Sequence, residues 1–192
     1  AVGLLVAYAT SMRLLPSSLM FLASLMAFSQ SVSAAELQCL ATTGMIGDLV
    51  KAVVGDRGHV EVLMSSGVDP HLYQPTRSDL AKVLTADVIF YNGLHLEGRM
   101  DEAFARAQKS GRSVCAVAEQ LPMQSLLHDG EDPEAHDPHV WMDPKRWRMV
   151  LLAIRDRCIV LDPSGRVVYE SNADAYLKKL NALDGYASKV LQ

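Results

Sequence analysis

The chain has 192 residues, of which 49% are hydrophobic and 21% are charged, and its formal net charge is −4. This length suits one ordinary domain and is short for two domains. The mild acidic excess and the lack of a basic stripe exclude an electrostatic reason for nucleic-acid binding, and they are compatible with a cation as the ligand.

Residues 1–34 differ in composition from the rest of the chain. From Met12, one arginine is followed by an apolar stretch and then by small residues, with Val32 and Ala34 at the −3 and −1 positions of a cleavage site. This order is typical of a secretory signal peptide. The apolar stretch contains a proline and several serines, and it is short for a membrane span of about 20 residues. We therefore expect upstream residues and a cleaved signal peptide at 1–34, and a mature protein that is periplasmic or extracellular.

Strand-like and helix-like segments alternate after residue 35. Runs or alternations of apolar residues predict strands, and apolar residues at helical spacing predict helices. The predicted strands are 36–43, 59–64, 87–93 and 113–119, and the predicted helices between them are 45–56, 77–86 and 96–111. Thr76 is the expected N-cap of the second helix, with Asp79 as its capping-box partner. This alternation predicts an α/β fold with a mainly four-stranded parallel sheet flanked by helices.

Two further helices are predicted after the fourth strand. One covers 144–163 and stops at Asp162-Pro163, and a longer one begins at Gly165 and is interrupted only by Gly185. No capping signal and no strand follow this last helix in the sequence. We therefore expect the 192 residues to be a fragment of a longer protein.

Three cysteines, Cys39, Cys115 and Cys158, are too few and too far apart for a disulfide framework or a cysteine-based zinc site. Cys39 and Cys115 fall in apolar strand-like segments, so buried small side chains are expected there. In an exported protein one pair could still oxidise.

The triplet Asp-Pro-His occurs twice, at 69–71 and at 137–139, and both copies lie in loops that follow predicted strands. Ligands of parallel sheets bind at the carboxyl ends of the strands, so His71 and His139 are candidates to meet at one edge. Proline stiffens the backbone before each histidine, and each aspartate is a candidate acceptor for the second ring nitrogen of a metal-binding imidazole. Neutral imidazole suits zinc and also accepts iron, copper and nickel, while added carboxylates shift the preference toward manganese. Two hydrogen-bonded loop histidines are the alternative.

The other four histidines have weaker arguments for metal binding. His59 opens a strand and is expected at the surface, and His95 sits in a tight turn where a structural hydrogen bond is expected. His128 and His136 lie in an acidic, proline-containing loop that is typical of a solvated segment, although flexible imidazoles and carboxylates can hold a cation loosely.

Four blocks of the chain, "TTGMIGDLV", "GVDPHLYQPTRSDL", "ADVIFYNGLHLEGRM" and "DPHVWMDP", together resemble the TroA-like substrate-binding proteins of ABC transporters for zinc, manganese or iron(II). The resemblance begins near Glu36 and extends to the end of the chain. It implies two α/β lobes joined by one long helix, with the metal held by two histidines of the first lobe and two residues of the second. The family pattern places the first two ligands at His71 and His139. It also makes "GLHLE" a structural block, so that His95 is not a ligand.

The resemblance further implies an organisation and a function. Residues 35–163 are expected to form the N-terminal metal-binding lobe and 164–192 the beginning of the inter-lobe helix, with the second lobe missing. The expected function is capture of a divalent transition metal, zinc or manganese, outside the cytoplasmic membrane and its delivery to the permease of an ABC transporter. We expect a monomer that is not an enzyme.

Two other functions stay open on the sequence. An exported zinc-dependent hydrolase could use His71, His139 and a carboxylate such as Asp143. It would also need a general base, and no glutamate lies at a recognisable catalytic spacing. An adhesin or interaction protein is the second alternative, because members of the resembled family are sometimes given that role, and no short motif argues for or against it.

Overall fold

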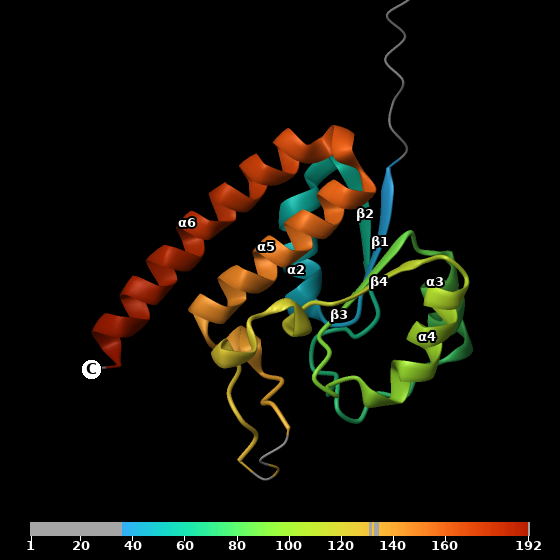
Figure 1. Cartoon of the computed structure of the whole chain (residues 1–192), viewed down its shortest axis with the longest axis horizontal. Coiled ribbons are helices and arrows are strands. Elements are labelled where there is room, and N and C mark those ends of the chain that lie inside the picture. The colour runs from blue at the N-terminus through green and yellow to red at the C-terminus, as the bar shows by residue number, and fades with distance from the viewer. Residues whose placement is uncertain (1–35, 131, 133–134, 192) are drawn as a thin grey trace, which may run out of the picture. The chain divides into compact units, whose positions relative to one another are not determined.

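The computed structural model describes residues 36–130, 132 and 135–191 (Figure 1). The predicted signal peptide at 1–34 lies outside the described residues. The strands are β1 (Leu37–Ala41), β2 (Gly58–Val62), β3 (Val88–Tyr91) and β4 (Ser113–Ala116), and the α-helices are α2 (Gly44–Val54), α3 (Arg77–Thr85), α4 (Asp101–Lys109), α5 (Pro144–Leu161) and α6 (Arg166–Val190). None of the helices in this described part is long and apolar enough to cross a membrane.

The four strands form one parallel sheet in the order β2-β1-β3-β4. Cys39 of β1 is in register with Val60 of β2 on one side and with Val88 of β3 on the other. A helix connects each strand to the next one along the chain, because parallel neighbours require a crossover connection. The predicted four-stranded parallel sheet is confirmed, and the carboxyl ends of its strands lie at one edge.

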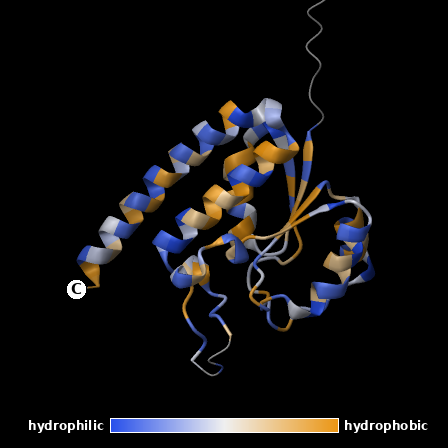
Figure 2. Cartoon of the chain, viewed as in Figure 1, coloured by the Kyte–Doolittle hydropathy of each residue, from blue (hydrophilic) through white to orange (hydrophobic). Residues whose placement is uncertain are grey.

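Helices cover both faces of the sheet. α2, α5 and α6 pack against one another on one face, and α3 and α4 pack together on the other (Figure 1). Successive residues of β1 alternate between the two cores: Cys39 and Ala41 contact the first group of helices, and Leu40 contacts the second. Strands that are buried on both faces are apolar along their whole length. In Figure 2, β3 is hydrophobic along its length, as expected for a central strand, whereas hydrophobic and hydrophilic residues alternate along α6.

The helix α2 shows how the sequence produces this packing. Leu49, Val50 and Val53 recur at helical spacing on one face, and all three side chains are fully buried. Each buried side chain of this size contributes about 1.5–3 kcal/mol of transfer free energy. The hydroxyl of Thr43 caps the helix by accepting the backbone N–H of Ile46.

One predicted helix boundary is wrong. The helix predicted at 96–111 begins only at Asp101. Gly93, Leu94 and His95 form a left-handed turn, with φ angles of 80°, 53° and 62°. The turn continues through residue 97, and Gly98–Met100 form a short 3-10 helix before α4 begins.

Several local predictions can be checked directly. The capping box of α3 is confirmed: the Thr76 hydroxyl accepts the Asp79 N–H at 3.2 Å, and the Asp79 carboxylate accepts the Thr76 N–H at 2.8 Å. Gly185 does not interrupt α6, which continues to Val190. Cys39 and Cys115 are buried, as predicted, and Cys158 is buried as well; all three are free.

Candidate metal site

Both Asp-Pro-His triplets lie beyond the carboxyl ends of the strands. The first belongs to the loop between β2 and α3, and the second ends the long loop between β4 and α5. Although 68 positions separate them, the Nε2 atoms of His71 and His139 lie 3.2 Å apart. Their ring centroids are 5.3 Å apart, with the planes tilted by 45°. The structure therefore brings together the two histidines that the sequence singles out.

The distance between these nitrogens matches what a single metal ion needs. Zinc binds imidazole nitrogen at about 2.0–2.1 Å, so two such bonds that span the His71–His139 separation enclose an angle of about 100°, close to tetrahedral. The pair could therefore hold one ion between the rings with little movement of either side chain.

Asp137 orients the ring of His139. Its Oδ1 atom accepts the backbone N–H of His139 at 2.9 Å and lies 2.6 Å from the ring Nδ1. The backbone hydrogen bond from His139 is the main cause that lowers the pKa of Asp137. Burial opposes this effect, and the bond to the His139 ring lowers the pKa further. Because an ionised carboxylate only accepts hydrogen bonds, Nδ1 carries the proton and the lone pair of Nε2 faces His71.

The first triplet is arranged differently from the second. Asp69 accepts the backbone N–H of His71 at 2.9 Å, which repeats the backbone half of the pattern. Within the described residues Asp69 has no hydrogen bond to the ring of His71. The expectation that each aspartate orients its own imidazole is therefore correct for Asp137 and wrong for Asp69, whose carboxylate oxygen faces the backbone.

The two rings open onto a cavity of about 330 Å³ whose lining includes His71, His139, His95, His136 and Asp137. The side chain of His139 is 45% exposed, and the edge of the Trp141 ring packs against it at a centroid distance of 5.2 Å. Among the residues that the structure describes, no group of three or more His, Cys, Asp or Glu side chains could hold a metal ion. A bound ion would therefore take its further ligands from water or from groups outside the described set.

The remaining histidines fall in three settings. His59 is exposed on β2, as predicted. His95 is exposed in the left-handed turn, and the structural hydrogen bond expected for its side chain is not found within the described residues. His128 and His136 pair through an antiparallel bridge with ring centroids 5.4 Å apart. The loop that carries this pair is therefore partly ordered by its own backbone rather than being a purely solvated segment.

Asp143, the carboxylate considered for a hydrolase, is used for another purpose. It caps α5 by accepting the Lys145 N–H at 2.8 Å, and it forms an ion pair with Arg146 at 2.5 Å. It does not line the cavity beside His71 and His139. Asp143 is therefore a structural residue at the start of α5.

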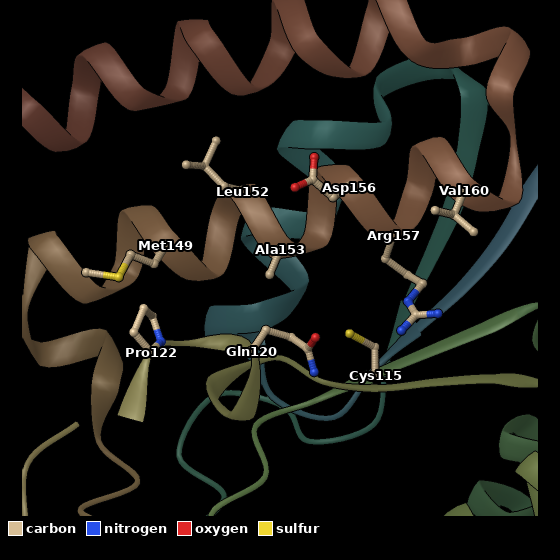
Figure 3. Close-up of a pocket in the computed structure, with 9 residues that line it drawn as sticks. All are labelled: Cys115, Gln120, Pro122, Met149, Leu152, Ala153, Asp156, Arg157 and Val160. Atoms are coloured by element: carbon tan, nitrogen blue, oxygen red, sulfur yellow. The ribbon is translucent and has the colours of Figure 1, made fainter. Parts of the chain in front are cut away.

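A larger hollow of about 550 Å³ lies between β4 and α5 (Figure 3). Its lining is mainly apolar and includes Met149, Leu152 and Val160, with the buried thiol of Cys115 at one side. Burial raises the pKa of this thiol, which makes it a poor metal ligand. No imidazole lines this hollow, so the smaller cavity beside the paired histidines is the better candidate site.

The sequence analysis does not predict a role for two buried residues near the site, Asn92 and Glu97. Asn92 is fully buried at the end of β3 and donates a hydrogen bond from Nδ2 to the Pro138 carbonyl at 3.0 Å. Glu97 in turn accepts the backbone N–H of Asn92 at 2.8 Å. The one sequence feature that could have identified them is the presence of Asn92 and Glu97 in the block "YNGLHLE", which directly follows an apolar strand.

Comparison with known proteins places these features in context. A family model described as "ZnuA: Zinc-uptake complex component A periplasmic" matches residues 39–192. The zinc-binding protein TroA of Treponema pallidum is 39% identical over 168 residues, which cover 86% of this chain and 54% of the relative. The manganese-binding lipoprotein MntA of Bacillus subtilis is 36% identical over 154 residues, which cover 80% of this chain and 50% of the relative.

Solved structures agree with the sequence comparison. The periplasmic zinc-binding protein TroA from Treponema pallidum superposes with a TM-score of 0.75 at 37% identity, covering 80% of this chain and 54% of that one. The chain thus spans about half the length of the curated relatives it matches.

Proposed function

Because this chain belongs to the ZnuA family of periplasmic zinc-uptake components, we propose that it serves the capture of a divalent transition metal outside the cytoplasmic membrane and its delivery to the permease of an ABC transporter. Zinc or manganese is the proposed ion, and His71 and His139 are the proposed ligands. Relatives described as substrate-binding lipoproteins of manganese or metal ABC transporters support this location and partner.

The observation that carries the proposal is the 3.2 Å separation of the two Nε2 atoms, with His139 oriented by Asp137. Two imidazole nitrogens close enough to bind one ion are the minimum that a metal-binding lobe must supply. The parallel sheet places both loops at one edge, and the prolines limit the backbone motion that binding would have to suppress.

The choice between zinc and manganese rests on the relatives and on ligand chemistry. TroA is described as zinc-binding and MntA as manganese-binding, so the family includes both metals. Two imidazoles favour zinc, and manganese requires additional oxygen ligands. We propose that this chain binds zinc more tightly than manganese when the ligands are the two histidines and water.

The proposal describes binding and not catalysis. The family is one of substrate-binding transport proteins, and capture of an ion breaks no covalent bond. A hydrolase would need a general base near a metal-bound water. Asp143 is engaged with Lys145 and Arg146 instead, which counts against that alternative.

We propose that residues 35–163 act as the metal-binding lobe and that 164–192 begin the helix that links it to a second lobe. The contacts of α6 with α2 and α5 support a firm attachment of this helix to the first lobe. We also propose that the protein acts as a monomer.

Titration of the chain with zinc chloride, followed by calorimetry, tests the function. His71→Ala and His139→Ala should each weaken zinc binding by more than about tenfold, because even the loss of a residue that orients a ligand costs 10–100-fold. His59→Ala is the matched control, since this exposed histidine lies on β2, away from the pair. Unchanged zinc affinity in both single variants would remove the assignment.

A further inference from the structure

A buried carboxylate lies two contacts away from the second Asp-Pro-His triplet. Glu97 is only 3% exposed, and its Oε1 atom accepts hydrogen bonds from the Thr42 hydroxyl at 2.6 Å and from the Asn92 N–H at 2.8 Å. Its Oε2 atom accepts the Gly93 N–H at 3.2 Å. A buried carboxylate is costly unless its oxygens are hydrogen-bonded. Glu97 meets this condition by joining the residue after β1 to the two residues after β3.

The same carboxylate holds an unusual stretch of backbone. Gly93, Leu94 and His95 are three consecutive residues with positive φ, and two of them carry side chains that disfavour this conformation. Glu97 binds the N–H of Gly93, and Glu119 binds the N–H of Leu94 at 3.1 Å. Such conformations persist only where the surroundings enforce them, and they gather at functional sites. This turn contributes Leu94 and His95 to the lining of the cavity beside the paired imidazoles.

Asn92 connects this network to the proposed metal ligand. Its side chain is fully buried, and its Nδ2 group donates to two carbonyls, that of Gly93 at 3.1 Å and that of Pro138 at 3.0 Å. The Pro138 carbonyl belongs to the peptide group that leads into His139. A hydrogen bond to this carbonyl limits the rotation and displacement of the segment from which the imidazole projects.

We infer that Glu97 and Asn92 are positioning residues for metal capture, which fix the second Asp-Pro-His triplet so that the Nε2 atom of His139 stays at metal-bridging distance from His71. The inference rests on the proposed function of the two histidines. Neither Glu97 nor Asn92 lines the cavity beside the two imidazoles. Glu97 binds the backbone N–H of Asn92, and the Asn92 side chain holds the backbone before His139. The network connects the ends of β1 and β3 to a loop more than 40 residues away, so the rigidity of the sheet is transmitted to one ligand.

Zinc titration of variants in the full chain tests this chain of contacts. Asn92→Ala removes the bond to Pro138, and Glu97→Gln weakens the acceptor that orients Asn92. Each should lower zinc affinity by about 10- to 100-fold, the usual effect of losing a residue that orients a metal ligand. Asn172→Ala is the matched control, because Asn172 also donates from Nδ2 to a backbone carbonyl, that of Val53 at 3.0 Å, at a distant place in the fold.

A pair of substitutions at Thr42 separates positioning from general stability. Thr42→Val removes the hydroxyl that binds Glu97 and keeps the shape of the side chain, whereas Thr42→Ser keeps the hydroxyl and removes a methyl group. If Glu97 acts through this bond, the valine variant loses zinc affinity and the serine variant retains it. If Thr42 contributes only to stability, the loss of zinc affinity in each variant should instead parallel the decrease in its melting temperature.

The outcomes distinguish this inference from the function on which it rests. If the unsubstituted chain binds no zinc through His71 and His139, the proposed function fails. If it does bind zinc, and Asn92→Ala, Glu97→Gln and Thr42→Val all keep its affinity within about twofold, well below the expected effect, the positioning role is wrong. Should the first two variants fail to fold, the comparison of Thr42→Val with Thr42→Ser decides the question.

Discussion

The ring of His139 and the carboxylate of Asp137 form a contact of 2.6 Å, and the corresponding contact between His71 and Asp69 is not found in the described residues. The two halves of the candidate site are therefore unequal. One imidazole has its tautomer fixed by a neighbouring charge, and the other is held through its backbone alone.

This inequality predicts different effects for two equivalent substitutions. Asp137→Asn should weaken zinc binding by about 10- to 100-fold, because the negative charge that keeps the proton on Nδ1 of His139 is lost. Asp69→Asn should cause a smaller loss, since an amide oxygen can still accept the backbone N–H of His71. Calorimetric titration of both variants checks this order. Equal losses, or no loss in Asp137→Asn, would contradict it.

Acid should remove the stabilisation that Asp162 contributes to the folded state. Burial alone would raise the pKa of Asp162, but hydrogen bonds from Ser164, Tyr169 and Arg57 outweigh it and hold this pKa well below its usual range. A lowered pKa in the folded state means that the stabilisation is present above the unfolded-state value of about 3.9, and is lost as the pH falls from there toward the folded-state value. Asp162→Asn should therefore lower the melting temperature at neutral pH.

The same substitution should have less effect on the melting temperature as the pH is lowered below about 4, because the aspartate is then losing its advantage over the unfolded chain. Thermal unfolding of both proteins between pH 3 and pH 7, values set about the unfolded-state pKa, measures the difference. A difference in melting temperature between the two proteins that grows as the pH falls would contradict this prediction.

Tyr169→Phe removes one of the hydrogen bonds to the Asp162 carboxylate, which has an oxygen–oxygen distance of 2.7 Å. This substitution should lower the free energy of unfolding by about 1–3 kcal/mol.

Loss of the cap on α3 should affect stability and leave metal binding intact. Thr76→Ala removes the hydroxyl that accepts the Asp79 N–H and should destabilise the protein by about 1 kcal/mol. Thr76→Ser retains an acceptor at the same position and should restore most of the loss. Denaturant unfolding gives the free energies, and zinc titration provides the comparison. A loss of zinc affinity without a change in stability would show that Thr76 acts on the site instead.

The sequence predicts the parts of this fold that depend on local patterns. Apolar residues at helical spacing, such as Leu49 and Val53 in α2, and the Thr76 capping box require only neighbouring residues, and both are confirmed. The meeting of His71 and His139 follows from a general property of parallel sheets, whose loops leave at one edge. Their actual separation depends on contacts between distant segments, which spacing alone does not predict.

The parts that the sequence misses depend on contacts far along the chain. The left-handed conformation of the turn after β3 is not predicted, and in it the backbone N–H of Leu94 is held by Glu119, 25 positions later. The role of Asn92 is defined by Pro138, 46 positions away. Neither partner can be identified from periodicity, because hydrogen bonds between distant loops leave no repeat in the sequence.

Anomalous scattering from crystals of the chain grown with zinc chloride shows directly whether His71 and His139 bind the same ion. The proposed ligand pair predicts one strong zinc peak within about 2.0–2.1 Å of the Nε2 atoms of both residues. A structure in which zinc binds elsewhere, for example between His128 and His136, while these two Nε2 atoms share no ion would contradict it.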